Sequence, residues 1–375
     1  MREYLLCLFV AAAVTYLSTP FARRFAIKWG AVAEVRDRDV HSHPTPRLGG
    51  LGILAGLLAA ILVASQLPLM SQVFQAPPGE LPTEVLGLVA GMLVLVLVGM
   101  IDDRYGLDPL SKFAGQVLAG GIIAYGGISI SWLPINGVFI LDPLGGVLIT
   151  VFIVVFTVNA INFVDGLDGL ATGISAIAAA AFFAYSYFLS VANGFDRATL
   201  PTLATAALVG ACLGFLPHNF YRARLFMGDT GSMLLGLVLA ASTVTLVGRV
   251  DPNAVGSTTL VPALLPLLIP VAVLAVPVLD VGLAVFRRTW KGRSPFEPDK
   301  EHLHHRIMEM GHSQTRAVLL LYGWAATVAG TFVALAFVPV AVALLVGAGV
   351  LAVVLTLLRS PPGRRINDER AEQVS

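Results

Sequence analysis

Several side chains that bind metal ions and phosphates lie close together between Gly99 and Phe113. Adjacent carboxylates at Asp102 and Asp103 are followed by Lys112 in this stretch. Paired carboxylates suit a hard divalent cation such as Mg2+, which takes oxygen ligands and often bridges to substrate phosphates. The alternative is that the two acids only mark the polar end of an apolar helix.

A second polar stretch, Asn159 to Leu170, reads N-A-I-N-F-V-D-G-L-D-G-L and interrupts an otherwise apolar region. Asp165 and Asp168 share one face if the turn between them is helical. Asn162 adds a neutral oxygen that can bind a metal ion or hydrogen-bond a base. Carboxylates at membrane depth are costly and usually face a cavity with partners, although a polar loop outside the membrane is the alternative.

The stretch from Pro217 to Ser232 contains Asn219, Phe226 and Asp229. Asp229 lies in a Gly-Asp-Thr-Gly-Ser turn that is expected to open a helix, and the backbone N–H groups of a helix N-terminus favour phosphate. Asp229 alternatively serves only as a helix cap. Phe226 can stack on a flat base, although an isolated Phe at a membrane interface more often belongs to the packing.

A fourth stretch, Phe286 to Arg306, is basic and carries His302, His304 and His305. This composition predicts an anion-binding loop. A His-X-His-His cluster also fits a transition-metal site, but the other candidate ligands are hard oxygen donors, so phosphate is the favoured ligand. A basic loop that contacts anionic lipid headgroups is the alternative.

The overall composition shows which elements must position these residues. Hydrophobic residues make up 57% of the 375-residue chain, charged residues only 13%, and the mean hydropathy is +0.82. Soluble proteins carry roughly a quarter charged residues, and disordered chains are rich in charge, so we expect an integral membrane protein. The net charge of +1 gives no indication of nucleic-acid binding.

Runs of about 20 apolar residues, the length that crosses a bilayer as a helix, predict an all-α polytopic membrane protein with about eleven transmembrane helices. The runs lie near 3–20, 48–70, 84–101, 113–130, 145–163, 169–190, 199–217, 230–248, 260–286, 317–337 and 340–358. We expect a single membrane-embedded domain over residues 1–358 and a polar cytoplasmic tail over 359–375.

The distribution of Lys and Arg, which favour the cytoplasmic side of membrane proteins, predicts the topology. With the N-terminus outside and the C-terminus inside, every Lys and Arg except Arg2, Arg197 and Arg249 falls on the cytoplasmic side. The same topology brings the polar residues of all four stretches to cytoplasmic helix ends or loops. The sequence therefore predicts one active site that faces the cytoplasm.

Together these stretches resemble the polyprenyl-phosphate N-acetylhexosamine-1-phosphate transferase family, and more closely its bacterial N-acetylglucosamine-1-phosphate branch. The resemblance is carried by H-P-T-P-R-L-G-G at 43–50, the Asp-Asp pair with the downstream Lys-Phe, N-A-I-N-F-V-D-G-L-D-G-L, F-M-G-D-T-G-S and H-L-H-H at 302–305. It implies an enzyme of the bacterial plasma membrane. The expected reaction transfers N-acetylglucosamine 1-phosphate from UDP-N-acetylglucosamine to a polyprenyl phosphate and releases UMP.

The resemblance also implies a role for each candidate residue. Mg2+, with Mn2+ as an alternative, would be bound by Asn162 and Asp229. The catalytic residues would be Asp102, Asp103, Lys112, His302, His304 and His305, with the lysine and the histidines on phosphate. The nucleotide would be bound by Asp165, Asp168, Asn219 and Phe226. The expected partners are the UDP-sugar and the polyprenyl phosphate, and a homodimer is compatible with the sequence.

Three alternatives stay open. Asp102 could be a general base, a nucleophile or an electrostatic element; direct attack by the lipid phosphate is favoured because a phosphate is largely deprotonated at neutral pH. The donor could be the UDP-muramoyl-pentapeptide of peptidoglycan synthesis, although H-L-H-H-R-I is closer to the N-acetylglucosamine branch. A secondary transporter could have as many spans, but transporters commonly place acids at the midplane between repeated halves, whereas here the acids gather at one face.

Overall fold

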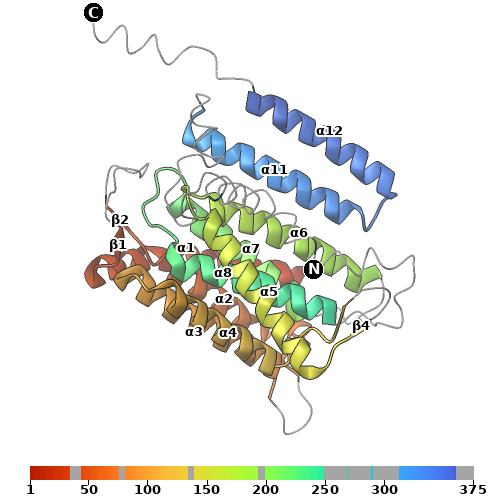
Figure 1. The fold of residues 1–375 in the computed structure, drawn as a ribbon, viewed down its shortest axis with the longest axis horizontal. Coiled ribbons are helices and arrows are strands. Elements are labelled where there is room, and N and C mark those ends of the chain that lie inside the picture. The colour runs from red at the N-terminus through yellow and green to blue at the C-terminus, as the bar shows by residue number, and fades with distance from the viewer. Residues whose placement is uncertain are drawn as a thin grey trace, which may run out of the picture.

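The computed structural model describes residues 1–33, 44–75, 81–133, 139–192, 199–248 and 312–359, with the single residues 268 and 289. Its helices are α1 (Arg2–Trp29), α2 (Gly49–Ala64), the short 3-10 helix η1 (Met70–Phe74), α3 (Thr83–Tyr105), α4 (Pro109–Tyr125), α5 (Pro143–Val164), α6 (Leu170–Ala192), α7 (Leu200–Asn219), α8 (Gly228–Gly248), α11 (Gln314–Ala334) and α12 (Val340–Arg359). Two antiparallel strand pairs, β1 (Val32–Ala33) with β2 (Thr45–Pro46) and β3 (Trp132–Leu133) with β4 (Phe139–Ile140), accompany them (Figure 1).

The apolar runs of the sequence coincide with these helices, apart from 260–286, which lies outside the described residues. Eight of the described helices are long and apolar enough to cross a membrane. α2 has only 16 residues and ends before Pro68, a residue type that does not continue a helix. The chain is therefore an all-α, multi-pass membrane protein, while the count of eleven spans stays a prediction.

Helix α8 forms the centre of the bundle. In its most apolar window 94% of the residues are buried, against 17% in α12, which lies at the edge (Figure 1). Glycines allow α3 and α5 to approach α8 closely: a Cβ at Gly99 would lie 2.5 Å from Thr230 Cα, and one at Gly236 would lie 2.5 Å from Val158 Cα. Small residues at such crossings are typical of membrane bundles. Here they bring the ends of α3 and α5 against the start of α8.

The segment before α2 is tied to the segment before α8. In the β1–β2 pair Val32 faces Pro46. The N–H of Phe226 donates to the carbonyl of Pro46 (2.8 Å), and the N–H of Gly49 donates to the carbonyl of Phe226 (3.0 Å). The backbone between β2 and α2 is therefore held beside Phe226, although almost 180 residues separate the two segments.

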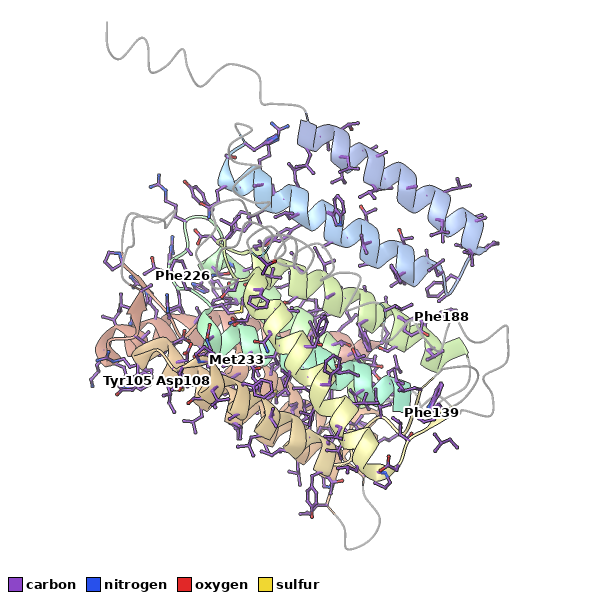
Figure 2. The ribbon with its side chains drawn as sticks, in the orientation of Figure 1. Tyr105, Asp108, Phe139, Phe188, Phe226 and Met233 are labelled. Carbon is purple, nitrogen blue, oxygen red and sulfur yellow. The ribbon has the colours of Figure 1, made fainter. Side chains whose placement is uncertain are left out.

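The helix ends that carry the candidate polar residues lie at one end of the bundle. Figure 2 shows Tyr105, Asp108 and Phe226 at this end, and Phe139 and Phe188 at the opposite end. Helices α3, α5 and α7 end there, while α4, α6 and α8 begin there. Among the described residues, the candidate acids of α3, α5 and α8 therefore lie at the same end of the bundle.

Candidate active site

Four helices each contribute one polar side chain to a connected cluster. Lys112 of α4 lies between two carboxylates: its Nζ is 2.9 Å from Asp102 Oδ2 of α3 and also pairs with Asp229 of α8. Asn162 of α5 donates from Nδ2 to Asp229 Oδ1 (2.8 Å) and to Ser232 Oγ (2.9 Å). The cluster therefore unites the Asp-Asp, N-A-I-N and Gly-Asp-Thr-Gly-Ser motifs around Asp229.

The turn between α3 and α4 fixes Lys112 against Asp102. Asp102 Oδ1 accepts a hydrogen bond from the N–H of Leu107 (2.7 Å). Asp108 caps α4 by accepting from the N–H groups of Leu110 and Ser111, each at 3.0 Å. Because both caps hold the turn, the first turn of α4 presents Lys112 directly to the end of α3.

Asp103, the neighbour of Asp102, has a different set of partners. Its side chain is buried, and its Oδ1 accepts from the N–H of Asp229 (3.0 Å). Its Oδ2 accepts from the N–H (3.0 Å) and the hydroxyl (2.7 Å) of Thr230. A carboxylate at a helix N-terminus is favourable because it satisfies donors that the helix leaves unpaired. Asp103 thus holds the start of α8 in place.

This contact corrects one sequence expectation. The N–H groups of Asp229 and Thr230 were expected to be available for phosphate at the start of a helix, and both are occupied by Asp103. For these two groups that expectation is wrong, because a carboxylate from another helix takes them. Phosphate recognition must use other donors at this end of the bundle.

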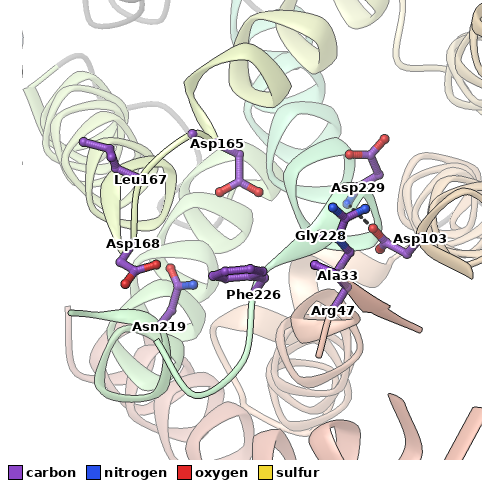
Figure 3. Close-up of a pocket in the computed structure, with 11 residues that line it drawn as sticks. Ala33, Arg47, Asp103, Asp165, Leu167, Asp168, Asn219, Phe226, Gly228 and Asp229 are labelled. Carbon is purple, nitrogen blue, oxygen red and sulfur yellow. Dashed lines mark hydrogen bonds between the residues drawn. The ribbon is translucent and has the colours of Figure 1, made fainter. Parts of the chain in front are cut away.

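A cavity of about 310 Å3 opens beside the cluster (Figure 3). Its lining consists of Ala33, Arg47, Asp103, Asp165, Gly166, Leu167, Asp168, Asn219, Phe226, Gly228 and Asp229. Figure 3 shows Asp168 and Asn219 together on one side of the cavity, Phe226 in the middle, and Asp103 and Asp229 on the other side. Asp168 and Asn219, which are predicted to bind the nucleotide, therefore lie across the cavity from Asp103 and Asp229.

Asp165, at the end of α5, carries an unusual charge state. Burial raises the pKa of its carboxyl to about 8, and repulsion from Asp229 and Asp103 acts in the same direction, while the positive charge of Arg47 opposes the rise. At neutral pH this carboxyl therefore holds a proton. The cavity is less negative than its acidic residues suggest, which favours an anionic ligand.

Asn219 and Asp168 lie together on one side of the cavity (Figure 3). Asn219 Oδ1 accepts from Gly169 N–H (3.2 Å) and Thr172 Oγ1 (2.8 Å), and its Nδ2 donates to the carbonyl of Leu225 (3.1 Å). An Asn amide has two N–H donors, so one N–H of Asn219 has no hydrogen-bond partner among the described residues. Asp168 Oδ2 accepts from the N–H of Ala223 (3.1 Å). Their roles toward uridine stay predictions.

The cluster offers oxygen ligands that suit a hard cation. Asp102 and Asp229 supply carboxylates, and Asn162 supplies an amide oxygen that accepts no hydrogen bond from the described part of the chain. Within the described ranges no three His, Cys, Asp or Glu side chains form a metal-binding group. Mg2+, however, is usually held by one or two carboxylates together with substrate phosphates, so this donor set fits it.

Several residues of this site have no role in the sequence prediction. Arg47 lines the cavity, Ser232 binds Asn162, and the hydroxyl of Tyr322 in α11 donates to the carbonyl of Gly169. Arg47 lies inside the quoted H-P-T-P-R-L-G-G motif, which was the signal available for it. The predicted catalytic residues His302, His304 and His305 lie outside the described residues.

Comparison with known proteins supports the same grouping of motifs. A profile described as glycosyl transferase family 4 matches residues 85–247. The decaprenyl-phosphate N-acetylglucosaminephosphotransferase of Mycolicibacterium smegmatis is 46% identical over 97% of this chain and 91% of the relative. The probable undecaprenyl-phosphate N-acetylglucosaminyl 1-phosphate transferase of Bacillus subtilis is 32% identical over 84% and 80%.

A relative with a different printed activity is also similar. The phospho-N-acetylmuramoyl-pentapeptide-transferase of Desulforudis audaxviator is 31% identical over 84% of this chain and 93% of the relative. This chain is thus more similar to the decaprenyl-phosphate N-acetylglucosamine enzyme, at 46% identity, than to the muramoyl-pentapeptide enzyme, at 31%. Each of the three alignments covers most of both chains. With these matches, this chain belongs to the polyprenyl-phosphate N-acetylhexosamine-1-phosphate transferase family.

Proposed function

We propose that the protein transfers N-acetylglucosamine 1-phosphate from UDP-N-acetylglucosamine to a polyprenyl phosphate, releasing UMP. The observation that carries the proposal is the cluster of Lys112, Asp102, Asp229 and Asn162 beside a cavity lined by Asp168, Asn219 and Phe226. The names of its relatives, which specify a polyprenyl phosphate and N-acetylglucosamine phosphate, support the donor and the acceptor.

We further propose eleven spans with the N-terminus outside and the C-terminus inside, in the plasma membrane of a bacterium. The distribution of Lys and Arg supports this topology. The cluster then faces the cytoplasm, where UDP-sugars are made. Residues 1–358 would form one membrane domain and 359–375 a cytoplasmic tail.

The main obstacle to this reaction is repulsion between the substrates. The lipid phosphate carries a charge of about −1.5 to −2, and the donor diphosphate about −2. At a separation of about 5 Å and an effective dielectric constant of about 20, they repel by roughly 10–13 kcal/mol. Lys112, held between Asp102 and Asp229, supplies positive charge at the point where the two substrates meet.

Asp229 and Asn162 would hold Mg2+, which would supply further positive charge beside the phosphates. In the step itself, an oxygen of the lipid phosphate attacks the phosphorus that bears the sugar. A new P–O bond forms there while the bond from that phosphorus to the bridging oxygen breaks, and UMP leaves with this oxygen. Asp102 orients the acceptor and takes any proton left on the lipid phosphate.

An assay of the purified protein tests the proposed function. With UDP-N-acetylglucosamine, decaprenyl phosphate and MgCl2, wild-type protein is expected to release UMP, and EDTA to stop the release. Asp229→Ala and Lys112→Ala should each lower turnover at least about 100-fold, because each removes charge stabilisation from the transition state. Leu118→Ala, on the exposed surface of α4, is the matched control. A folded wild-type protein that releases no UMP would refute the proposal.

Two variations of this assay separate the remaining alternatives. UDP-N-acetylglucosamine and the UDP-muramoyl-pentapeptide are supplied in competition, and preferential use of the muramoyl donor would assign the other branch. Labelled UMP is also incubated with UDP-N-acetylglucosamine without lipid acceptor. Direct attack predicts no exchange of label, whereas a covalent phosphoryl-enzyme predicts that label enters the donor.

A further inference from the structure

Among the described residues that line the cavity, Arg47 is the one whose side chain carries a fixed positive charge. The lining contains four carboxylates, at Asp103, Asp165, Asp168 and Asp229. Figure 3 shows Arg47 extending toward Asp103 and Asp229, on the side of the cavity opposite Asp168. Its position raises the question of what this guanidinium binds.

The neighbouring carboxylates already have partners. Asp103 binds the start of α8, and Asp229 binds Lys112 and Asn162. Within the part of the chain that the structure describes, the guanidinium of Arg47 makes no hydrogen bond and no ion pair. A guanidinium has five N–H donors in a planar fork that matches the oxygens of a phosphate. Arg47 is thus a cation at the cavity wall whose donors remain available.

The backbone of Arg47 is held in place from both sides. Its N–H donates to the carbonyl of Ala31 (2.9 Å), and the preceding Pro46 carbonyl accepts from Phe226. The following residue, Leu48, is the one non-glycine residue with positive φ (86°) in the described ranges. Such a conformation persists only where the surroundings enforce it, and it often marks a functional site. The guanidinium is therefore presented from a fixed backbone next to Phe226.

The arrangement of the cavity indicates which phosphate Arg47 meets. Uridine bound between Phe226 and the Asp168–Asn219 wall would direct its phosphates toward Asp229, past Arg47. The N–H groups of Asp229 and Thr230 at the start of α8 are occupied by Asp103, so they cannot bind these phosphates. We propose that Arg47 binds the phosphate attached to the uridine, which is the phosphate that leaves as UMP. This inference rests on the proposed UDP-sugar donor.

The test compares UMP with uridine, which differ only in that phosphate. Binding of each to purified protein in detergent is measured by titration calorimetry in EDTA, so that the result does not depend on metal. Wild-type protein is expected to bind UMP more tightly than uridine. Arg47→Ala should weaken UMP binding about 10- to 100-fold, the range for a charge-assisted hydrogen-bonded pair, and leave uridine binding unchanged.

Two further variants keep the test informative if Arg47→Ala is unstable. Arg47→Met keeps a side chain of similar length but removes the positive charge, so it should behave like Arg47→Ala. Arg47→Lys keeps the charge without the planar fork, so its UMP affinity should fall between those of wild type and Arg47→Met. Arg24→Ala, at an exposed position of α1, is the control and should bind both ligands like wild type.

The outcomes separate this inference from the proposed function. If wild-type protein binds UMP and all Arg47 variants bind it equally well, the role of Arg47 is refuted and the proposed function stands. Equal losses for UMP and uridine would likewise refute it, because Arg47 would then only shape the cavity. If wild-type protein neither binds UMP nor releases it from UDP-N-acetylglucosamine, the proposed function fails, and this inference fails with it.

Discussion

At the scale of single residues, Asp102 and Asp103 are adjacent and chemically identical but have different partners. Successive side chains of an α-helix point about 100° apart, so Asp102 faces Lys112 while Asp103 faces α8. In the proposed reaction, Asp102 is the acid that lies beside Lys112, where the two substrates would meet. Asp103 acts on the reaction through Asp229, whose backbone it holds, and we therefore expect it to be a positioning residue.

Asp103→Asn should test that division. The amide group replaces one carboxylate oxygen with a donor, which would face an N–H or the hydroxyl at the start of α8. An unsatisfied buried donor costs about 1–3 kcal/mol, so we expect a lower melting temperature and roughly 10- to 100-fold slower turnover. The melting temperature and the UMP affinity are measured beside turnover. Loss of turnover with both of these unchanged would instead place Asp103 in the chemistry.

The carboxyl of Asp165 makes the stability of the folded protein depend on pH. The pKa of its carboxyl is raised to about 8 in the folded protein, from an unfolded value of 3.8, chiefly by burial. Between these values the folded state holds a proton that the unfolded state has released, so this group makes stability fall as pH rises from about 4 to 8.

Asp165→Asn removes this titrating group and should flatten the dependence. In ligand-free protein we expect the variant to raise the apparent melting temperature by a few degrees at pH 8 and by less at pH 6. Thermal unfolding in detergent across this pH range provides the measurement, with wild type as the reference. A difference between variant and wild type that stays constant with pH would show that Asp165 is ionised throughout.

At the scale of the elements, an amide pair between buried Gln116 and partly buried Asn159 fixes α4 against α5. Asn159 Nδ2 donates to Gln116 Oε1 (2.6 Å) and to the carbonyl of Val155 (2.7 Å), and Gln116 is only 3% exposed. Gln116 lies one turn after Lys112 on α4, and Asn159 lies one turn before Asn162 on α5. The pair therefore fixes the register at which Lys112 and Asn162 both reach Asp229.

Replacing Gln116 or Asn159 by Leu should uncouple the two helices. Each single variant leaves a buried amide without its partner, so we expect a lower melting temperature and a higher Mg2+ concentration for half-maximal activity. The double variant should lose less stability than the sum of the singles, because no amide is then left unpaired. Melting temperatures of the full cycle provide the measurement, with Leu118→Ala as control. Strictly additive losses would show that the pair carries no coupling.

The elements also show where sequence reasoning succeeds and where it ends. Apolar runs predict the described helices because helix formation in a bilayer depends on length and hydrophobicity. The meeting of Lys112 with Asp229 depends on packing around α8, which the motifs imply only through resemblance. The position of Arg47 depends on the pairing of β2 with the segment before α8, and two segments so far apart in the chain leave no local pattern.

At the scale of the whole molecule, the helix directions support the proposed topology, because α3, α5 and α7 end where α4, α6 and α8 begin. Helices α3 and α5 both join the end of the bundle that carries the cluster to the opposite end, as Figures 1 and 2 show. The distribution of Lys and Arg along the sequence supports the proposal that this end faces the cytoplasm. In the proposed reaction, the site would take a soluble nucleotide from one side of the membrane and a lipid from within it.

Thiol labelling in spheroplasts can test this orientation directly. The two native cysteines, Cys7 and Cys212, are buried and should react little. A cysteine at Tyr105, which is 67% exposed at the cluster end, should react with a membrane-impermeant maleimide only after the membrane is permeabilised. A cysteine at Ser131, exposed at the opposite end, should react in intact spheroplasts. Because one membrane separates the two positions, the reverse labelling pattern would place the cluster outside, away from the cytoplasmic UDP-sugars, and would contradict the proposed topology.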